Sequence, residues 1–129
     1  MDIDSIREYC LSFPGATEQL QWGDSLLFKV RGKIFTTVNL EMAANRIALK
    51  CTPELFADLI EREGIAPSPY VGRYNWVALE SLDTVVDHEL RDLIRRSYEL
   101  VEAKAPKLKG KAAKRKSARG KALRRKAIR

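Results

Sequence analysis

Residues 26–40, LLFKVRGKIFTTVNL, hold the pattern that decides the fold. Apolar side chains, with one threonine among them, occupy every second position on both sides of an Arg31-Gly32 pair. These positions are Leu26, Phe28, Val30, Ile34, Thr36, Val38 and Leu40. A period of two is typical of a strand with one buried face, and glycine readily adopts the positive φ of a tight turn. The stretch therefore predicts a β-hairpin.

Two further strands and a first helix are predicted around the hairpin. Residues 46–51, RIALKC, alternate again, so every second side chain of this strand would share one face. Residues 73–80 combine aromatic and branched side chains, which are frequent in strands. Residues 3–13 show apolar spacings of three and four, which indicate an amphipathic helix.

Two more helices are predicted from their start signals. One begins at Thr52, a capping hydroxyl followed by Pro53 at the first helical position, and ends at Gly64. The other begins near Thr84, which pairs with Asp87 as in a capping box. Its inner face is predicted to comprise Val86, Leu90, Leu93, Ile94, Ser97 and Val101. The hydroxyl on that face is expected to bond back to a carbonyl one turn earlier.

The predicted order of elements is α-β-β-β-α-β-α. Strands linked by a hairpin pair in antiparallel fashion, and the apolar face of their sheet needs a covering layer. We therefore expect the α+β class, with an antiparallel sheet packed against helices. Residues 1–103 are long enough for one such domain, and residues 104–129 form a separate unit.

Charge divides the chain at the same place. Residues 104–129, called the tail from here on, carry 13 of the 24 Lys and Arg and none of the 17 Asp and Glu. Residues 1–103, the body, keep 11 basic and all 17 acidic residues, a formal charge of −6. A dense block of like charge repels itself and cannot be buried, so the tail is predicted to be disordered.

The tail is predicted to bind a polyanion, and nucleic acid is the densest one in a cell. The candidate phosphate contacts are Lys104, Lys107, Lys109, Lys111, Lys114, Arg115, Lys116, Arg119, Lys121, Arg124, Arg125, Lys126 and Arg129. Without aromatic residues or a fixed scaffold, such a tail would contact phosphates rather than read bases. The alternatives are a solubilising extension, or one that binds acidic proteins or membrane headgroups.

Four cations of the body are further candidates for nucleic-acid contact, namely Lys29, Arg31, Lys33 and Arg73. The first three lie on the predicted hairpin, and the fourth precedes Tyr74 and Trp76, which could pack on a sugar or base. The alternative is that these cations keep strand edges from aggregating and that Trp76 belongs to the core.

Catalysis and cofactor binding find little support, so we expect a protein that is not an enzyme and has no cofactor. His88 is the single histidine and is predicted to face solvent, whereas Cys10 and Cys51 are predicted to be reduced and buried. One histidine and two distant cysteines cannot build a zinc site or a catalytic triad. The acidic residues near the N-terminus are interpreted as a complement to a helix dipole rather than as an iron site.

Four short stretches have a distinctive order and spacing. They are residues 10–18 (CLSFPGATE), 28–35 (FKVRGKIF), 49–54 (LKCTPE) and 97–101 (SYELV), the last shortly before KAPK at 104–107. Tyr70 and Trp76 add an aromatic pair between the third and fourth stretches. On these residues the chain resembles the MmcQ/YjbR family of small bacterial proteins over residues 1–107.

The resemblance implies an α+β fold of the kind grouped with frataxin-like and secretion-chaperone-like domains. It also implies DNA binding, because hairpins of this family look like a pair of wings. The alternative function is a protein–protein adaptor in the style of secretion chaperones, whose tail only localises it. A third class is a protein that binds a small ligand or a metal.

Together these observations predict a DNA-binding protein that associates with duplex phosphate backbones mainly without sequence specificity. No stretch approaches the roughly 20 apolar residues that cross a bilayer, so no membrane span is expected. Asp2 and Asp4 are unlike the basic start of a signal peptide. We therefore expect a cytoplasmic protein, associated with the nucleoid.

Overall fold

The computed structural model describes residues 1–21, 24–41, 46–69 and 72–105. Its helices are α1 (Ile3–Leu11), α2 (Pro53–Leu59), α3 (Asp87–Lys104) and the single 3-10 turn η1 (Gly72–Tyr74). Its strands are β1 (Ala16–Gln21), β2 (Ser25–Val30), β3 (Lys33–Asn39), β4 (Ile47–Lys50), β5 (Ile65–Pro67) and β6 (Trp76–Leu79). The tail from residue 106 onward, with its predicted disorder and predicted phosphate contacts, lies outside the described residues.

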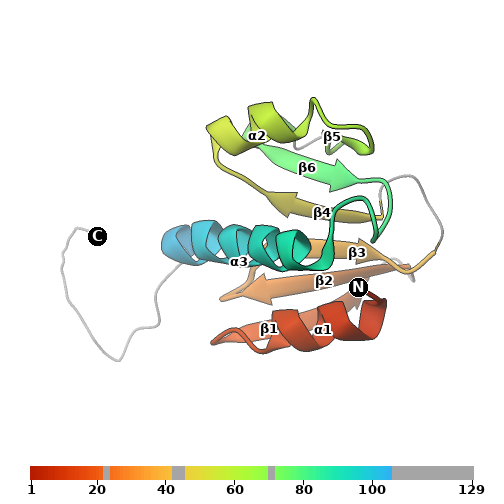
Figure 1. Cartoon of the computed structure of the whole chain (residues 1–129). Coiled ribbons are helices and arrows are strands. Elements are labelled where there is room, and N and C mark those ends of the chain that lie inside the picture. Colours follow the sequence, from red (N-terminus) through yellow and green to blue (C-terminus); the bar gives the residue numbers. More distant parts are fainter. Residues whose placement is uncertain (22–23, 42–45, 70–71, 106–129) are drawn as a thin grey trace, which may run out of the picture.

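The strands form a sheet of order β1-β2-β3-β4-β6-β5 in which every neighbouring pair is antiparallel. In Figure 1, α3 crosses one face over β3 and β4, and α1 lies beside it against β1. The predicted α+β class, the antiparallel sheet packed on helices and the predicted order of elements are confirmed. Two strands, β1 and β5, are additional to that prediction.

The predicted hairpin is confirmed, with Arg31 and Gly32 as its two-residue turn. Both residues have positive φ, 47° and 83°, as the turn that best fits twisted antiparallel strands requires. The register shifts after Phe28, so β3 carries one extra residue at that point. As a result Phe35 is buried as well as Thr36, and the strict alternation predicted for β3 is broken. Beyond the bulge, Ile34 is only half-buried.

The core lies between the sheet and the helices and is centred on packed aromatic rings. Phe13, which follows α1, stacks on Tyr98 of α3 with ring centroids 4.6 Å apart. Phe35 of β3 meets both rings edge-on, at 6.1 and 5.2 Å. The Tyr98 hydroxyl donates to the carbonyl oxygen of Pro14 at 2.6 Å. Phe13, the last residue of the apolar stripe predicted for residues 3–13, therefore packs against both α3 and the hairpin.

Ser97 lies on the buried face of α3, as predicted, but its partner is different. The hydroxyl does not bond one turn back. It donates to the Phe35 carbonyl oxygen of β3 at 2.5 Å and accepts from the Lys50 backbone N–H of β4 at 2.9 Å. The β3–β4 ladder runs from Val38 to Thr36 and stops just before this point. Ser97 thus supplies hydrogen bonds where the two strands separate.

The start of α3 differs from the capping-box prediction. The helix begins at Asp87 after Val86, which makes no side-chain cap bond and is 59% exposed rather than on the inner face. The Thr84 hydroxyl accepts instead from the Ser81 backbone N–H at 2.9 Å. Thr84 therefore closes the turn before the helix, and this use of the hydroxyl prevents the predicted cap. The other predicted inner-face residues are buried.

The second helix begins as predicted but is shorter. The Thr52 hydroxyl accepts from the Leu55 N–H at 3.2 Å, so the predicted cap is present. The helix ends at Leu59, before Gly64. The short β5 then pairs with β6 at the edge of the sheet. A proline at the last position of β5 is compatible with an edge strand, because no further strand needs its missing N–H.

Candidate nucleic-acid interface

A hollow of about 370 Å³ opens at the end of the sheet where β4 ends and β3 and β6 begin. The last turns of α3 form its other wall. We call it the lysine groove, and its lining residues are Lys33, Ile34, Lys50, Trp76, Leu100, Val101 and Lys104. The arrangement is an apolar floor with three ammonium groups around it. Among the described lining residues there is no carboxylate.

Lys50 is held in the groove by its backbone and its side chain. Its N–H donates to Ser97, which ties the end of β4 to α3. It pairs directly with Trp76 across β4 and β6, so the two side chains share one face of the sheet. The ammonium donates to the Tyr74 carbonyl oxygen at 2.9 Å. Burial lowers the pKa of Lys50 below its ordinary value, and the nearby Lys104 lowers it further.

The two other lysines reach the groove from distant parts of the chain. Lys33 begins β3 directly after the hairpin turn, and Lys104 ends α3. Both are exposed. Within the described residues, the ion pairs involve Arg7, Arg31, Arg62, Arg95, Arg96 and the N-terminal amine, and none of the three groove lysines. The groove therefore gathers cations whose charge no described carboxylate balances.

The remaining predicted body cations lie elsewhere or have internal partners. Arg31 donates from Nη2 to the Glu102 carbonyl oxygen at 2.8 Å and to the Glu102 carboxylate at 3.2 Å, which attaches the hairpin turn to α3. The Lys29 ammonium donates to the Gln19 side chain at 2.7 Å, on β1 and away from the groove lining. Arg73 lies in η1, and its side chain is outside the described residues. Of the hairpin cations, only Lys33 lines the groove.

Lys50 is the site residue that sequence reasoning missed. It stands alone in a short strand between apolar residues, and its charge has no local pattern to distinguish it. The signal available was its place in the stretch LKCTPE, together with the predicted position of Trp76 in another strand. The side chains meet because β4 pairs with β6, and this non-local pairing is not encoded in either segment by itself.

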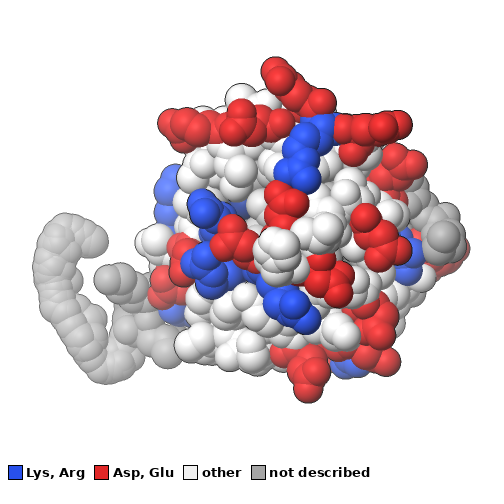
Figure 2. Space-filling model, in the orientation of Figure 1, with Lys and Arg blue, Asp and Glu red and all other residues white. Residues whose placement is uncertain are grey.

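The body surface around the groove is mixed in charge. In Figure 2, acidic side chains crowd the top of the molecule over α2 and spread along its right side, while basic ones lie among them toward the C-terminal half of α3. This distribution is expected for a body with a formal charge of −6. A polyanion approaching the body would therefore be attracted to a limited part of it.

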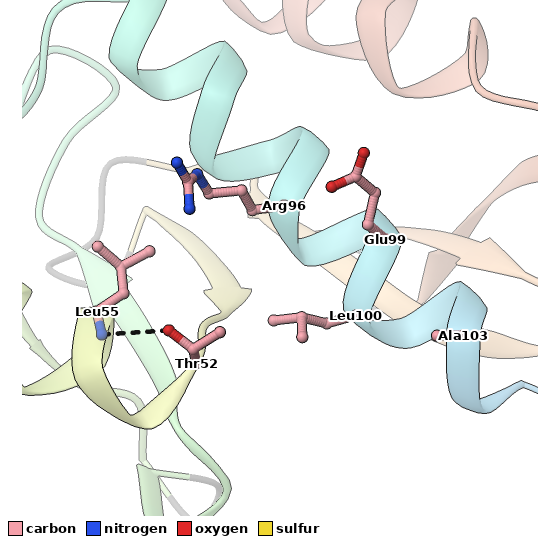
Figure 3. A pocket seen from close by; sticks show the side chains of 6 residues that line it. All are labelled: Thr52, Leu55, Arg96, Glu99, Leu100 and Ala103. Carbon is pink, nitrogen blue, oxygen red and sulfur yellow. Dashed lines mark hydrogen bonds between the residues drawn. The ribbon is translucent and has the colours of Figure 1, made fainter.

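A second hollow of about 230 Å³ lies on the other side of the same helical turn. It shares Leu100 with the lysine groove and is lined as well by Thr52, Leu55, Arg96, Glu99 and Ala103. Figure 3 shows Leu100 of α3 pointing toward Thr52, with Leu55 of α2 on the far side of Thr52. This hollow is mainly apolar, and its charged lining residues, Arg96 and Glu99, are of opposite sign, whereas those of the groove are all lysines.

Neither thiol, nor the histidine, is among the described lining residues of the two hollows. Cys10 and Cys51 are buried and free, as predicted. Burial raises the pKa of Cys10 to about 12 and that of Cys51 to about 11, so neither is a ready nucleophile at neutral pH. His88 is exposed, as predicted. Within the described residues, no group of three potential metal-ligating side chains comes together, and no helix is long and apolar enough to cross a membrane.

The fold and this groove define a small α+β domain with an antiparallel sheet and a basic end. The YjbR family model matches residues 11–100, and the chain belongs to that family. The predicted resemblance is thereby confirmed. No match was found among curated proteins.

Two solved structures share the fold. A Deinococcus radiodurans protein described by the domain name DUF419 is 24% identical, with a TM-score of 0.69 over 87% of this chain and 95% of its own. A Pseudomonas syringae protein is 20% identical, with a TM-score of 0.63 over 78% of this chain and 99% of its own. Because both identities are below 25%, the similarity to these two proteins shows a shared fold.

Proposed function

We propose that this protein is a non-enzymatic, cytoplasmic DNA-binding protein that associates with duplex phosphate backbones mainly without sequence specificity. The observation that carries the proposal is the separation of charge. The tail holds 13 Lys and Arg and no acidic residue, whereas the body has a formal charge of −6. The tail supplies most of the affinity through counterion release.

The position of the lysine groove supports a second contact by the body. Lys104 is both the first residue of the tail and a lining residue of the groove. The chain therefore continues directly from the groove into the twelve Lys and Arg of residues 106–129. A phosphate backbone bound by the tail is brought close to Lys33 and Lys50, and these orient the body on it.

The test is the salt dependence of duplex binding by three proteins. They are the full chain, a chain ending at Ala105, and a full-length chain with Gln at the twelve basic positions of 106–129. The chain ending at Ala105 keeps the whole groove. If about half of the tail charges contact phosphates, log K falls against log salt with a slope of roughly −6 for the full chain.

Both altered proteins should bind at least about 100-fold more weakly at low salt, with a slope nearer −2 or −3 from the groove alone. The Gln variant controls for tail length, and thermal unfolding of the body controls for folding. Equal affinity and equal slope for all three proteins would contradict the proposal.

A protein-binding adaptor is the second candidate function, and the observation that favours it is the hollow lined by Leu55 and Leu100. An apolar side chain of a partner could enter it while Arg96 and Glu99 form polar contacts at its rim. This function does not need the tail for recognition. The absence of duplex binding by the full chain at low salt would favour it over the DNA-binding proposal.

A further inference from the structure

The lysine groove has the size and lining of a ligand site rather than of a simple phosphate contact. Its volume of about 370 Å³ falls within the range of small-molecule pockets. Four of its lining side chains are apolar, namely Ile34, Trp76, Leu100 and Val101. A duplex backbone needs only exposed cations, whereas an apolar floor between cations suits a ligand with a flat apolar part and an anionic part.

Trp76 is the side chain that distinguishes the groove. It is partly exposed, and in the described part of the chain its ring contacts no other aromatic ring. The rings of Phe13, Phe35 and Tyr98, by contrast, pack on one another in the core. Trp76 therefore presents an aromatic surface beside ammonium groups, which is the combination that single-stranded nucleic-acid sites use.

The charges of the lining lysines indicate which kind of ligand the groove would bind. Three lysines without a described carboxylate favour an anion, and the charge on Lys50 is disfavoured by burial and by the nearby Lys104, so a bound anion would relieve that cost. The rest of the protein's own tail is not expected to fill the groove, because the twelve Lys and Arg of residues 106–129 would be repelled by these lysines. An acidic peptide would satisfy the lysines but does not in general supply a planar ring for Trp76.

We propose that the lysine groove binds one unpaired nucleotide of a nucleic-acid strand, with its base stacked on Trp76 and its phosphate between Lys33, Lys50 and Lys104. This inference rests on the proposed nucleic-acid function and refines it. The tail holds any strand by its phosphates, and the groove adds a preference for single strands, frayed ends or gaps, where a base is free to leave the stack.

The test uses the full chain with Trp22→Phe, which leaves Trp76 as the single tryptophan. The probes are a short oligothymidylate and a blunt-ended duplex of the same charge. They are added at an ionic strength where the electrostatic contribution of the tail is reduced. The single strand should quench Trp76 fluorescence, and the duplex should leave it nearly unchanged.

Affinity is then measured by anisotropy for three groove variants and one control variant in that background. Trp76→Leu and Lys50→Gln should each weaken single-strand binding by about tenfold. Trp76→Leu should change duplex binding by less than about twofold, whereas Lys50→Gln also removes a phosphate contact and should weaken duplex binding by up to about fivefold. Trp76→Phe keeps a stacking surface and should retain most of the affinity. Arg91→Gln is the matched control, since it removes one exposed charge from the other half of α3 and should change neither affinity.

The outcomes separate the two proposals. If both probes bind but neither quenches Trp76 and Trp76→Leu binds the single strand normally, the groove assignment is wrong and the tail function stands. If neither probe binds the full chain at any salt concentration, the proposed function fails and the groove assignment fails with it. Equal quenching by polyglutamate would overturn the nucleotide assignment in favour of an acidic peptide. Thermal unfolding checks that each variant is folded.

Discussion

Two groups of basic residues in the body, one on α3 and one around the lysine groove, differ in how their charge is balanced. In the first, Arg95 and Arg96 share Asp92, and Arg95 also binds Glu99 at 3.1 Å. We call these four residues the ion-paired cluster. In the lysine groove, one turn further along the helix, no described carboxylate pairs with the three ammonium groups. Both groups carry basic side chains, but of the two only the groove has charge left for an external anion.

The difference shows why counting basic residues does not locate an interface. A paired arginine contributes little net field outside the protein, and an exposed pair contributes only about 0–1 kcal/mol to stability. An unpaired lysine that is partly buried opposes folding instead, because its charged form loses hydration. The groove thus has the energetic character of a binding site, and the ion-paired cluster has that of a local stabilising contact.

The largest predicted effect concerns the attachment of the groove to α3. Ser97→Ala removes both hydrogen bonds of the hydroxyl and leaves the Phe35 carbonyl and the Lys50 N–H without a partner. Each unsatisfied buried group costs about 1–3 kcal/mol, so the free energy of unfolding should fall by about 2–4 kcal/mol. Denaturant unfolding measures this, with Ser12→Ala as a control at an exposed hydroxyl. A change for Ser97→Ala as small as that of the control would show that α3 does not hold these strands.

The second prediction compares the groove lysines with arginines that already have carboxylate partners. Gln at Lys33, Lys50 and Lys104 should weaken duplex binding roughly 10- to 100-fold at low salt, because three phosphate contacts are lost. Gln at Arg62, Arg95 and Arg96 removes the same formal charge, but from residues that already have carboxylate partners. That variant should weaken binding by no more than about threefold, since it leaves the phosphate contacts in place. Anisotropy titrations of both triple variants would contradict the comparison if the two losses were equal.

A smaller effect is expected when the ion-paired cluster is opened. Arg96 and Arg95 hold the pKa of Asp92 below its ordinary value of 3.8. The carboxylate therefore stabilises the folded state above pH 3.8, and this stabilisation is lost as pH falls through the lowered pKa. Asp92→Asn should cost at most about 1 kcal/mol at neutral pH, and the difference from the parent should vanish in acid.

Asp92→Asn should also leave the ion-paired cluster with positive charge that no described carboxylate balances, as in the lysine groove. Arg96 loses its partner in Asp92→Asn, so duplex binding should strengthen slightly, by about twofold. Thermal unfolding across pH and anisotropy at one pH measure the two effects. A stability difference that grows on acidification would show that the carboxylate is not stabilised by these arginines.

The smallest effect concerns the pH dependence contributed by Lys50. Its pKa is lowered in the folded protein, so folding disfavours the charged form. The resulting loss of folding free energy is fully present below the pKa that Lys50 has in the folded protein. It disappears as pH rises from that pKa to the pKa of the unfolded chain, near 10.5. The parent should therefore gain stability relative to Lys50→Gln on raising the pH from 8 toward 10.5. Unfolding curves at several alkaline pH values measure this, and a relative loss would contradict it.

Much of the fold could be predicted because its signals are local. The alternation around Arg31-Gly32 fixes the hairpin, and the spacing from Leu90 to Val101 fixes the buried side of α3. By contrast, β1 was not predicted, because its sequence ATEQLQ is mostly polar and it lies at the edge of the sheet. An edge strand gains its pairing from β2 rather than from its own burial. The other edge strand, β5, was not predicted either, because it is short and ends in a proline, which is unusual inside a sheet.

The site was predicted only in part, for a different reason. Lys33 and Lys104 were among the predicted contacts because they lie in visibly basic stretches. Arg31 stands in one of those stretches too, but Glu102, 71 positions away, binds it. Lys50 belongs to the groove because of strand pairing with Trp76. Which cations have internal partners depends on such tertiary contacts, and charge patterning in the sequence does not reveal them.

The most direct test of the central claim is to map the bound surface by nuclear magnetic resonance. Backbone amide and tryptophan indole signals of the full chain would be followed as nucleic acid is added. We predict that the largest body shifts fall on Lys33, Lys50, Lys104 and the Trp76 indole, with little change at Arg95 and Arg96. Shifts centred on the ion-paired cluster, or distributed without preference over the body, would contradict the account.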